Sequence, residues 1–115
     1  MSKDYSREII EKIAELKSKG FEFGKSERYL KHRTGINFKE MTEELKACKQ
    51  LVFTEKRKIN GEERYTLYFV YSRSKGRVYA LTLRSRIRII TVFPLGRRTL
   101  SRYHKQRFKK IRRYK

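Results

Sequence analysis

Three arginines alternate with small or apolar residues in the stretch RSRIRIITVF, residues 84–93. Because successive side chains of a strand point to opposite faces, this alternation predicts a strand with one basic face and one largely apolar face. The two sets are Arg84, Arg86 and Arg88 against Ile87, Ile89, Thr91 and Phe93. Guanidinium groups bind phosphate oxygens through paired hydrogen bonds, whereas unpaired charge is costly to bury. The stretch therefore predicts either a phosphate-binding row or a solvated strand face that uses arginine.

The charge of the chain is concentrated in its second half. The formal net charge is +20, and no acidic residue follows Glu63. Charge of one sign gathered on one half is typical of nucleic-acid binders. With the three arginines above, the candidate nucleic-acid contacts are Arg73, Lys75, Arg77, Arg97, Arg98, Arg102, Lys105 and Lys109. Four tyrosines are candidates for stacking on bases: Tyr65, Tyr68, Tyr71 and Tyr79.

Several classes of protein are disfavoured. The single Cys48 forms no disulfide within the chain, and two histidines without cysteine pairs disfavour a zinc site. No nucleotide-binding glycine motif or metalloprotease motif is present, so no metal and no cofactor are expected. The chain has no apolar segment of 18 residues and no signal-peptide pattern, which predicts a cytoplasmic protein without a membrane partner. The scarcity of Asn and Gln fits a thermophilic source.

The elements that would position these residues form a single α+β domain over residues 1–115. Apolar spacing predicts a helix over residues 5–19, a connector at 21–24, a second helix over 25–33, and a third that begins at Asn37. Alternation then predicts strands over 51–56, 64–72, 77–83 and 86–93. Asn60-Gly61 marks a hairpin, and Pro94 is expected to end the last strand. Short turns predict a four-stranded antiparallel meander, followed by a basic helix over 99–113.

This order of elements resembles the RelE/ParE-like toxin fold, and within it the small basic BrnT-like proteins. The matching stretches are LTLRSRIRIITVFPLGRRTLSRY, residues 81–103, and ERYLKHRTGINFKEMTEEL, residues 27–45. The family strand runs into Ser-Ala-Arg, whereas this chain has Thr-Val-Phe-Pro at 91–94, so Arg97 or Arg98 would stand in for that arginine. The resemblance implies a metal-independent endoribonuclease whose partners are RNA, the ribosome and a small acidic antitoxin.

Cleavage at an RNA 2′-OH requires a base for its proton and cations for the phosphate charge. The resemblance implies that Arg86 and Arg88 provide the cations. His104 is the first candidate for the base by intrinsic pKa, although its place on an apolar helix stripe also fits a packed residue. Tyr71 is a second candidate, provided that surrounding positive charge lowers its pKa. Two alternatives stay open: a non-catalytic RNA- or DNA-binding protein, and a ribosome-associated or packaging protein whose charge only neutralises phosphate.

Overall fold

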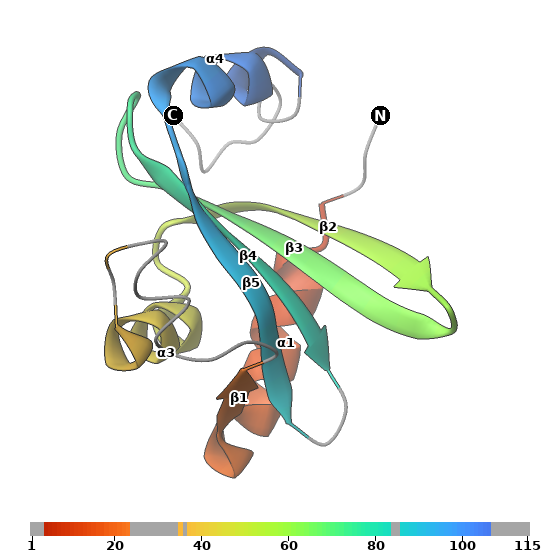
Figure 1. Ribbon diagram of the computed structural model, residues 1–115. Helices are drawn as coiled ribbons and strands as arrows, with labels where there is room; N and C mark the ends of the chain where they lie inside the picture. Colours follow the sequence, from red (N-terminus) through yellow and green to blue (C-terminus); the bar gives the residue numbers. More distant parts are fainter. Residues whose placement is uncertain (1–3, 24–34, 36, 84–85, 107–115) are drawn as a thin grey trace.

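The computed structural model describes residues 4–23, 35, 37–83 and 86–106, and it is an α+β fold (Figure 1). Its helical elements are α1 (Ser6–Leu16), the 3-10 turn η1 (Lys17–Lys19), α3 (Phe38–Ala47) and α4 (Arg97–Gln106). Its strands are β1 (Phe21–Phe23), β2 (Leu51–Ile59), β3 (Glu62–Val70), β4 (Gly76–Leu83) and β5 (Ile87–Leu95). The helix predicted over 25–33 lies outside the described residues.

The sheet differs from the predicted four-stranded antiparallel meander. It has five strands in the order β1-β5-β4-β3-β2, and β1 pairs with β5 in parallel. The antiparallel part, from β2 to β5, follows the predicted order of consecutive neighbours. The meander is therefore one part of a mixed sheet, and the extra strand comes from the segment predicted as a connector.

Strand β1 was missed because three residues give too little alternation to identify a strand. Gly20, with φ of +89°, ends η1 in a conformation that favours glycine. Phe21 and Phe23 then pack against the core while Glu22 is exposed, and the rings of Phe23 and Phe38 lie 4.2 Å apart. A strand rather than the predicted connector therefore positions both aromatics against the core.

Strand β5 does not keep one apolar face along its length. Its pairing with β4 shifts between Leu81↔Ile89 and Ala80↔Thr91, so Ile90 is an extra residue that reverses the alternation. Ile89 belongs to one hydrophobic core, whereas Phe93 packs against the other. The predicted common face of the four residues from Ile87 to Phe93 is therefore wrong beyond Ile89.

Pro94 also lies within β5, opposite Arg77, rather than ending it. On the other side of β5, β1 pairs only with Ile87–Ile89. The proline thus lies in the part of β5 that pairs with a described strand on one side alone, and sheets tolerate proline on such edge positions.

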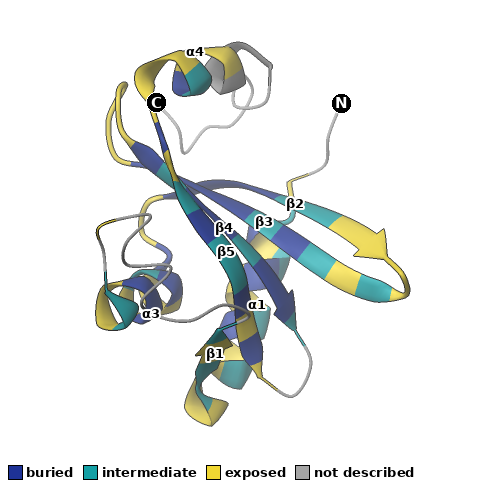
Figure 2. Ribbon diagram, viewed as in Figure 1, coloured by how far each residue is buried: buried dark blue, intermediate teal, exposed yellow. Residues whose placement is uncertain are grey.

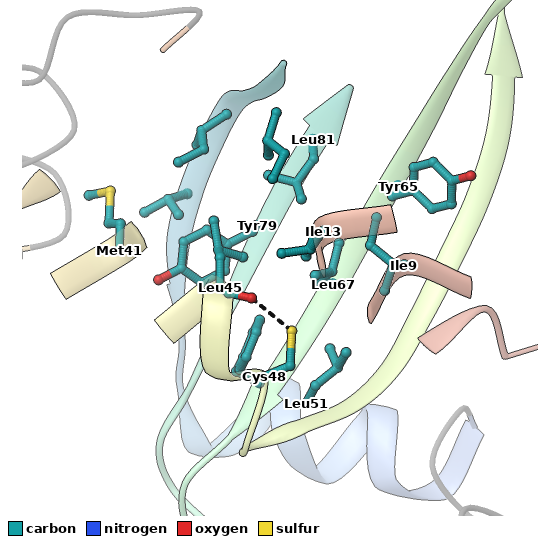
Figure 3. Packing of buried hydrophobic residues seen from close by; sticks show 14 residues of the cluster. Ile9, Ile13, Met41, Leu45, Cys48, Leu51, Tyr65, Leu67, Tyr79 and Leu81 are labelled. Atoms are coloured by element: carbon teal, nitrogen blue, oxygen red, sulfur yellow. Dashed lines mark hydrogen bonds between the residues drawn. The ribbon is translucent and has the colours of Figure 1, made fainter. Parts of the chain in front are cut away.

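Two cores occupy the two faces of the sheet. Figure 2 shows the buried stretches of the strands, and Figure 3 shows the larger core. Helices α1 and α3 cover the larger core, in which the predicted stripe residues Ile9, Ile13, Met41 and Leu45 are buried. Leu100 of α4 closes the smaller core on the opposite face. A Cβ atom on Gly76 would lie 2.7 Å from the Phe69 carbonyl oxygen and 3.3 Å from Leu100 Cδ2, so glycine permits this close packing.

Two local signals, the helix start at Asn37 and the hairpin at Asn60-Gly61, are confirmed. The Asn37 side chain caps α3 by accepting a hydrogen bond from the Glu40 N–H at 2.9 Å. Asn60 and Gly61 both have positive φ and form the β2–β3 hairpin turn. Cys48 is buried, as expected of a small apolar residue, and its thiol donates to the Leu45 carbonyl at 2.9 Å (Figure 3).

The segment before α1 also contacts the outer strand of the sheet. Asp4 Oδ1 accepts hydrogen bonds from the N–H groups of Ser6, in the first turn of the helix, and Thr54, in β2. The Tyr5 N–H in turn donates to the Thr54 carbonyl at 2.9 Å. In the part of the chain that the structure describes, no helix has the length and apolar character needed to cross a membrane.

Candidate nucleic-acid interface

Arg86 immediately precedes β5 and Arg88 is its second residue, and both are exposed. Arg88 stands opposite Thr82 of β4 and beside Glu22 of β1, on the sheet face opposite its buried neighbours Ile87 and Ile89. Neither arginine forms an ion pair with any acid in the described part of the chain. Arg84, the third arginine of the predicted row, lies outside the described residues.

A second group of predicted contacts lies at the other end of β4 and β5. Arg73 and Lys75 belong to the exposed turn between β3 and β4, and Gly76 pairs with Leu95 immediately before α4. The exposed α4 arginines are Arg97, Arg98 and Arg102. Leu95 lies seven positions after Arg88 in β5, a separation of roughly 23 Å along an extended strand. The predicted basic surface is thus divided between two ends of the sheet. Lys109 and the side chain of Lys105 lie outside the described residues.

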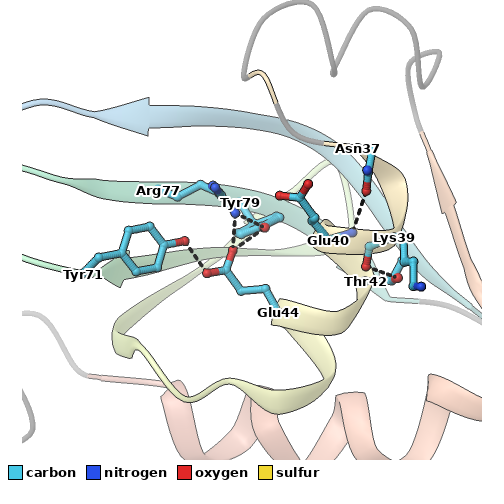
Figure 4. Close-up of polar contacts among 8 residues, drawn as sticks. All are labelled: Asn37, Lys39, Glu40, Thr42, Glu44, Tyr71, Arg77 and Tyr79. Atoms are coloured by element: carbon cyan, nitrogen blue, oxygen red, sulfur yellow. Dashed lines mark hydrogen bonds and ion pairs between the residues drawn. The ribbon is translucent and has the colours of Figure 1, made fainter.

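Arg77 is held on the α3 side of the sheet instead of joining either group (Figure 4). Its Nη1 donates to Glu44 Oε1 at 2.7 Å, and both side chains are largely shielded from solvent. Glu44 also accepts hydrogen bonds from the hydroxyl groups of Tyr79, at 2.5 Å, and Tyr71. The arginine therefore serves to join α3 to β4, and its predicted contact with phosphate would require this network to open.

The environment of Tyr71 differs from the one expected of a base. Burial and the hydrogen bond to Glu44 raise its pKa well above the ordinary value, and these effects exceed the opposing effect of Arg77. The expected lowering of the pKa by positive charge is therefore wrong. The protonated hydroxyl keeps its ability to donate a hydrogen bond.

Three of the four predicted stacking tyrosines are buried. Tyr65, Tyr68 and Tyr79 are at most 4% exposed, and all three donate their hydroxyl groups to carboxylates. Tyr71 is 39% exposed, so its ring alone among these four is accessible to a base. Alternation identified β3 and β4 as strands, but it does not show that both faces of the sheet are covered. The stacking prediction is therefore wrong for Tyr65, Tyr68 and Tyr79.

A second cluster ties a basic residue to acids on the α1 side. Lys56 Nζ lies 2.7 Å from Glu8 Oε2 and 2.8 Å from Glu63 Oε2, and Tyr65 donates to the same Glu8 oxygen at 2.6 Å. These contacts raise the pKa of Lys56 and lower that of Glu8. Sequence analysis missed the roles of Glu8 and Glu44, although both are acids that flank the apolar stripe of a helix.

The structure describes neither the side chain of His104, the remaining candidate for the base, nor a metal site. His104 belongs to α4, but its side chain lies outside the described residues. Among the residues that the structure describes, no group of three or more His, Cys, Asp or Glu side chains is arranged to hold a metal ion. Comparison of the chain with protein-family models, curated proteins and solved structures found no match.

Proposed function

We propose that the protein binds nucleic acid, with RNA favoured over DNA, through the exposed arginines at the two ends of β5. The observation that supports this proposal is that the basic side chains fall into two groups, those paired with carboxylates and those exposed without a described partner. Arg77 and Lys56 are held by carboxylates, whereas Arg86, Arg88, Arg73 and the α4 arginines are exposed without a described ion-pair partner.

Exposed guanidinium groups on a rigid strand suit the phosphate backbone. Ile87 and Ile89, both buried, anchor the part of β5 that presents Arg88. The planar guanidinium is preorganised to donate two parallel hydrogen bonds to a phosphate. The preference for RNA rests on the resemblance of residues 81–103 to the RelE-like toxins.

Salt dependence tests the binding. Labelled single-stranded RNA and DNA of equal sequence are titrated with the protein by fluorescence anisotropy at several salt concentrations. Neutralising six to ten phosphates predicts that affinity falls by about 10³–10⁵-fold between 50 and 200 mM salt. Affinity that does not change with salt would contradict the phosphate-contact model, and tighter binding of DNA would contradict the preference for RNA.

A second function, metal-independent endoribonuclease activity of the RelE type, is favoured by exposed arginines at the end of the sheet where α4, the helix of His104, lies. In such a reaction the 2′-oxygen loses its proton to a base and attacks the adjacent phosphorus, and the expelled 5′-oxygen takes a proton from an acid. Arg86 and Arg88 lie at the other end of β5 from α4, so Arg73 and Arg97 would stabilise the phosphate charge beside His104, the candidate for the base. Tyr71, whose pKa is raised, is a candidate for the acid. This second proposal places the protein in the cytoplasm, with the ribosome and a small acidic antitoxin as its partners.

Cleavage is tested with labelled RNA in EDTA, with and without ribosomes. Products should carry a 2′,3′-cyclic phosphate, and a 2′-deoxy substitution at the cleaved position should abolish them. Arg73→Ala and His104→Ala should each slow cleavage while circular dichroism stays unchanged. Absence of cleavage under both conditions removes this second function and leaves the binding proposal standing.

A further inference from the structure

A groove of about 1150 Å³ lies at the end of the sheet where β2 begins and β3 ends. Four segments form it: α1, the turn from α3 to β2, the turn from β3 to β4, and α4, which lies near that second turn in Figure 1. The groove is remote along β5 from Arg86 and Arg88, so it is a separate site from the start of that strand.

The floor of the groove is apolar. Leu51, Val70 and Leu100 contribute it from β2, β3 and α4. Ile10 and Tyr71 extend it, and they are 38% and 39% exposed. Among the described residues, three large hydrophobic side chains are exposed, and these are two of them. Exposed apolar area is therefore concentrated beside this groove.

The Tyr71 ring is fixed in place. Its hydroxyl donates to Glu44, and the guanidinium carbon of Arg77 lies 5.5 Å from its ring centroid. A ring restrained at both its hydroxyl and its face loses little freedom when a flat ligand packs against it. It thus gives the floor a preorganised aromatic surface.

The rim of the groove is basic. Lys49, Arg73 and Arg97 come from the α3–β2 turn, the β3–β4 turn and α4, and no Asp or Glu is among the lining residues. None of the three forms an ion pair within the described part of the chain. A ligand that fits this surface must be anionic at its edges and flat or apolar at its centre.

We propose that this groove binds a short unpaired segment of nucleic acid, with bases on the apolar floor and phosphates on the basic rim. The inference rests on the proposed nucleic-acid binding and adds that the strand must be single. In a duplex the base faces are stacked on one another, so only phosphates would reach the groove. Its volume exceeds the roughly 300–1,000 Å³ of a pocket for one small molecule, which favours more than one nucleotide.

The hairpin of β2 and β3 provides a matched control. Ile59 is 39% exposed, close to the 38% of Ile10. The groove variant is Ile10→Ser, and the hairpin variant is Ile59→Ser, so neither removes a proposed phosphate contact. Both make the same chemical change on an exposed side chain, and thermal unfolding verifies that each is folded.

The experiment measures the affinity of both variants for a 10-nucleotide RNA containing 2-aminopurine and for a duplex of the same length. Relative to the hairpin variant, the groove variant should bind the single strand roughly tenfold more weakly, as expected for loss of a base-stacking surface. Its affinity for the duplex should match that of the hairpin variant. Binding of the single strand should change 2-aminopurine fluorescence less in the groove variant than in the hairpin variant.

Equal single-strand affinities of the two variants would overturn the groove while leaving the proposed function intact. Equal losses on single strand and duplex would overturn the placement of bases. If an acidic, leucine-rich peptide binds the groove and RNA does not displace it, the site recognises protein instead. If the wild-type protein binds neither nucleic acid, the proposed function fails, and this inference fails with it.

Discussion

The basic residues on the helix-covered face of the sheet behave differently from those at its ends. Arg77 and Lys56 contact Glu44, Glu8 and Glu63 at 2.7–2.8 Å and hold α3 and α1 to the strands. Arg86 and Arg88 at one end, and Arg73 and Arg97 at the other, have no described ion-pair partner.

The difference shows that net charge alone does not locate a binding surface in this protein. With 12 acids against 32 bases, the positions of the few acids decide which cations are structural. A carboxylate that is partly buried with its cation fixes that cation's geometry, whereas an exposed cation stays available to a mobile anion. The candidate nucleic-acid contacts are therefore the exposed cations that have no described carboxylate partner.

The largest effect is expected at Glu44. Glu44→Gln leaves Arg77 partly buried without its carboxylate and weakens the hydrogen bonds from two tyrosines. Breaking such a pair should lower the free energy of unfolding by about 3 kcal/mol. Urea denaturation measures this loss, and Glu43→Gln, at an exposed position of the same helix, should change it little. Equal stability of the two variants would show that Arg77 is not held as described.

A smaller loss is expected at Gly76, which lies beneath α4 at the groove end. A Cβ in Gly76→Ala would meet the Phe69 carbonyl oxygen at 2.7 Å and Leu100 at 3.3 Å. The backbone must shift, at a cost of about 2 kcal/mol typical of overpacking. Thermal unfolding measures this, with Gly96→Ala as the control because no atom lies within 4 Å of its Cβ position. If Gly76→Ala is as stable as that control, the contact between α4 and the sheet is loose.

The exposed arginines of β5 should affect binding without affecting stability. Replacing Arg86 and Arg88 together by alanine removes two phosphate contacts and should weaken RNA binding by about tenfold at low salt. The slope of log K against log salt should fall by about 2. Anisotropy titrations measure both quantities. An unchanged slope would place these arginines outside the interface, and a lowered melting temperature would assign them a structural role.

The smallest effect concerns the pH dependence of Glu8. Hydrogen bonds from Lys56 and Tyr65 lower the pKa of this carboxyl below its ordinary 4.5. Because the folded state favours the ionised form, the stabilisation is present above pH 4.5 and is lost as the pH falls through the folded-state pKa. Glu8→Gln should therefore be less stable than the wild type at pH 7, by under about 1 kcal/mol, and the two should converge as the pH falls through the folded-state pKa of Glu8. A constant difference across this range would exclude the ion pair as its cause.

Local signals predicted the elements well. The apolar stripes of residues 5–19 and 37–48, the Asn37 cap and the Asn60-Gly61 turn depend on neighbours in the chain, and the structure has all of them. The parallel pairing of β1 with β5 and the bulge at Ile90 depend on contacts between distant segments. No periodicity of a single segment encodes those contacts, so neither was predicted.

In the candidate nucleic-acid interface, too, local features were predicted and contacts between distant elements were not. Alternation identified Arg88 as facing away from Ile87 and Ile89, and the structure agrees. The same reasoning gave Arg77 and Tyr71 to the interface, because nothing in the sequence shows that Glu44 of another element lies against them. Lys49 was not singled out, since it lies in a turn without a pattern of its own.

The contact between Asp4, Tyr5 and Thr54 has a consequence for self-association. Strand β2 is at the edge of the sheet, and an open edge is a template for pairing with another chain. The Asp4 carboxylate and the Tyr5 N–H occupy the N–H and carbonyl groups of Thr54. Beyond them, the exposed side chains of Arg57 and Lys58 carry positive charge that repels a second copy. A few residues before α1, together with these two charges, thus help to keep an otherwise exposed edge from seeding β-aggregation.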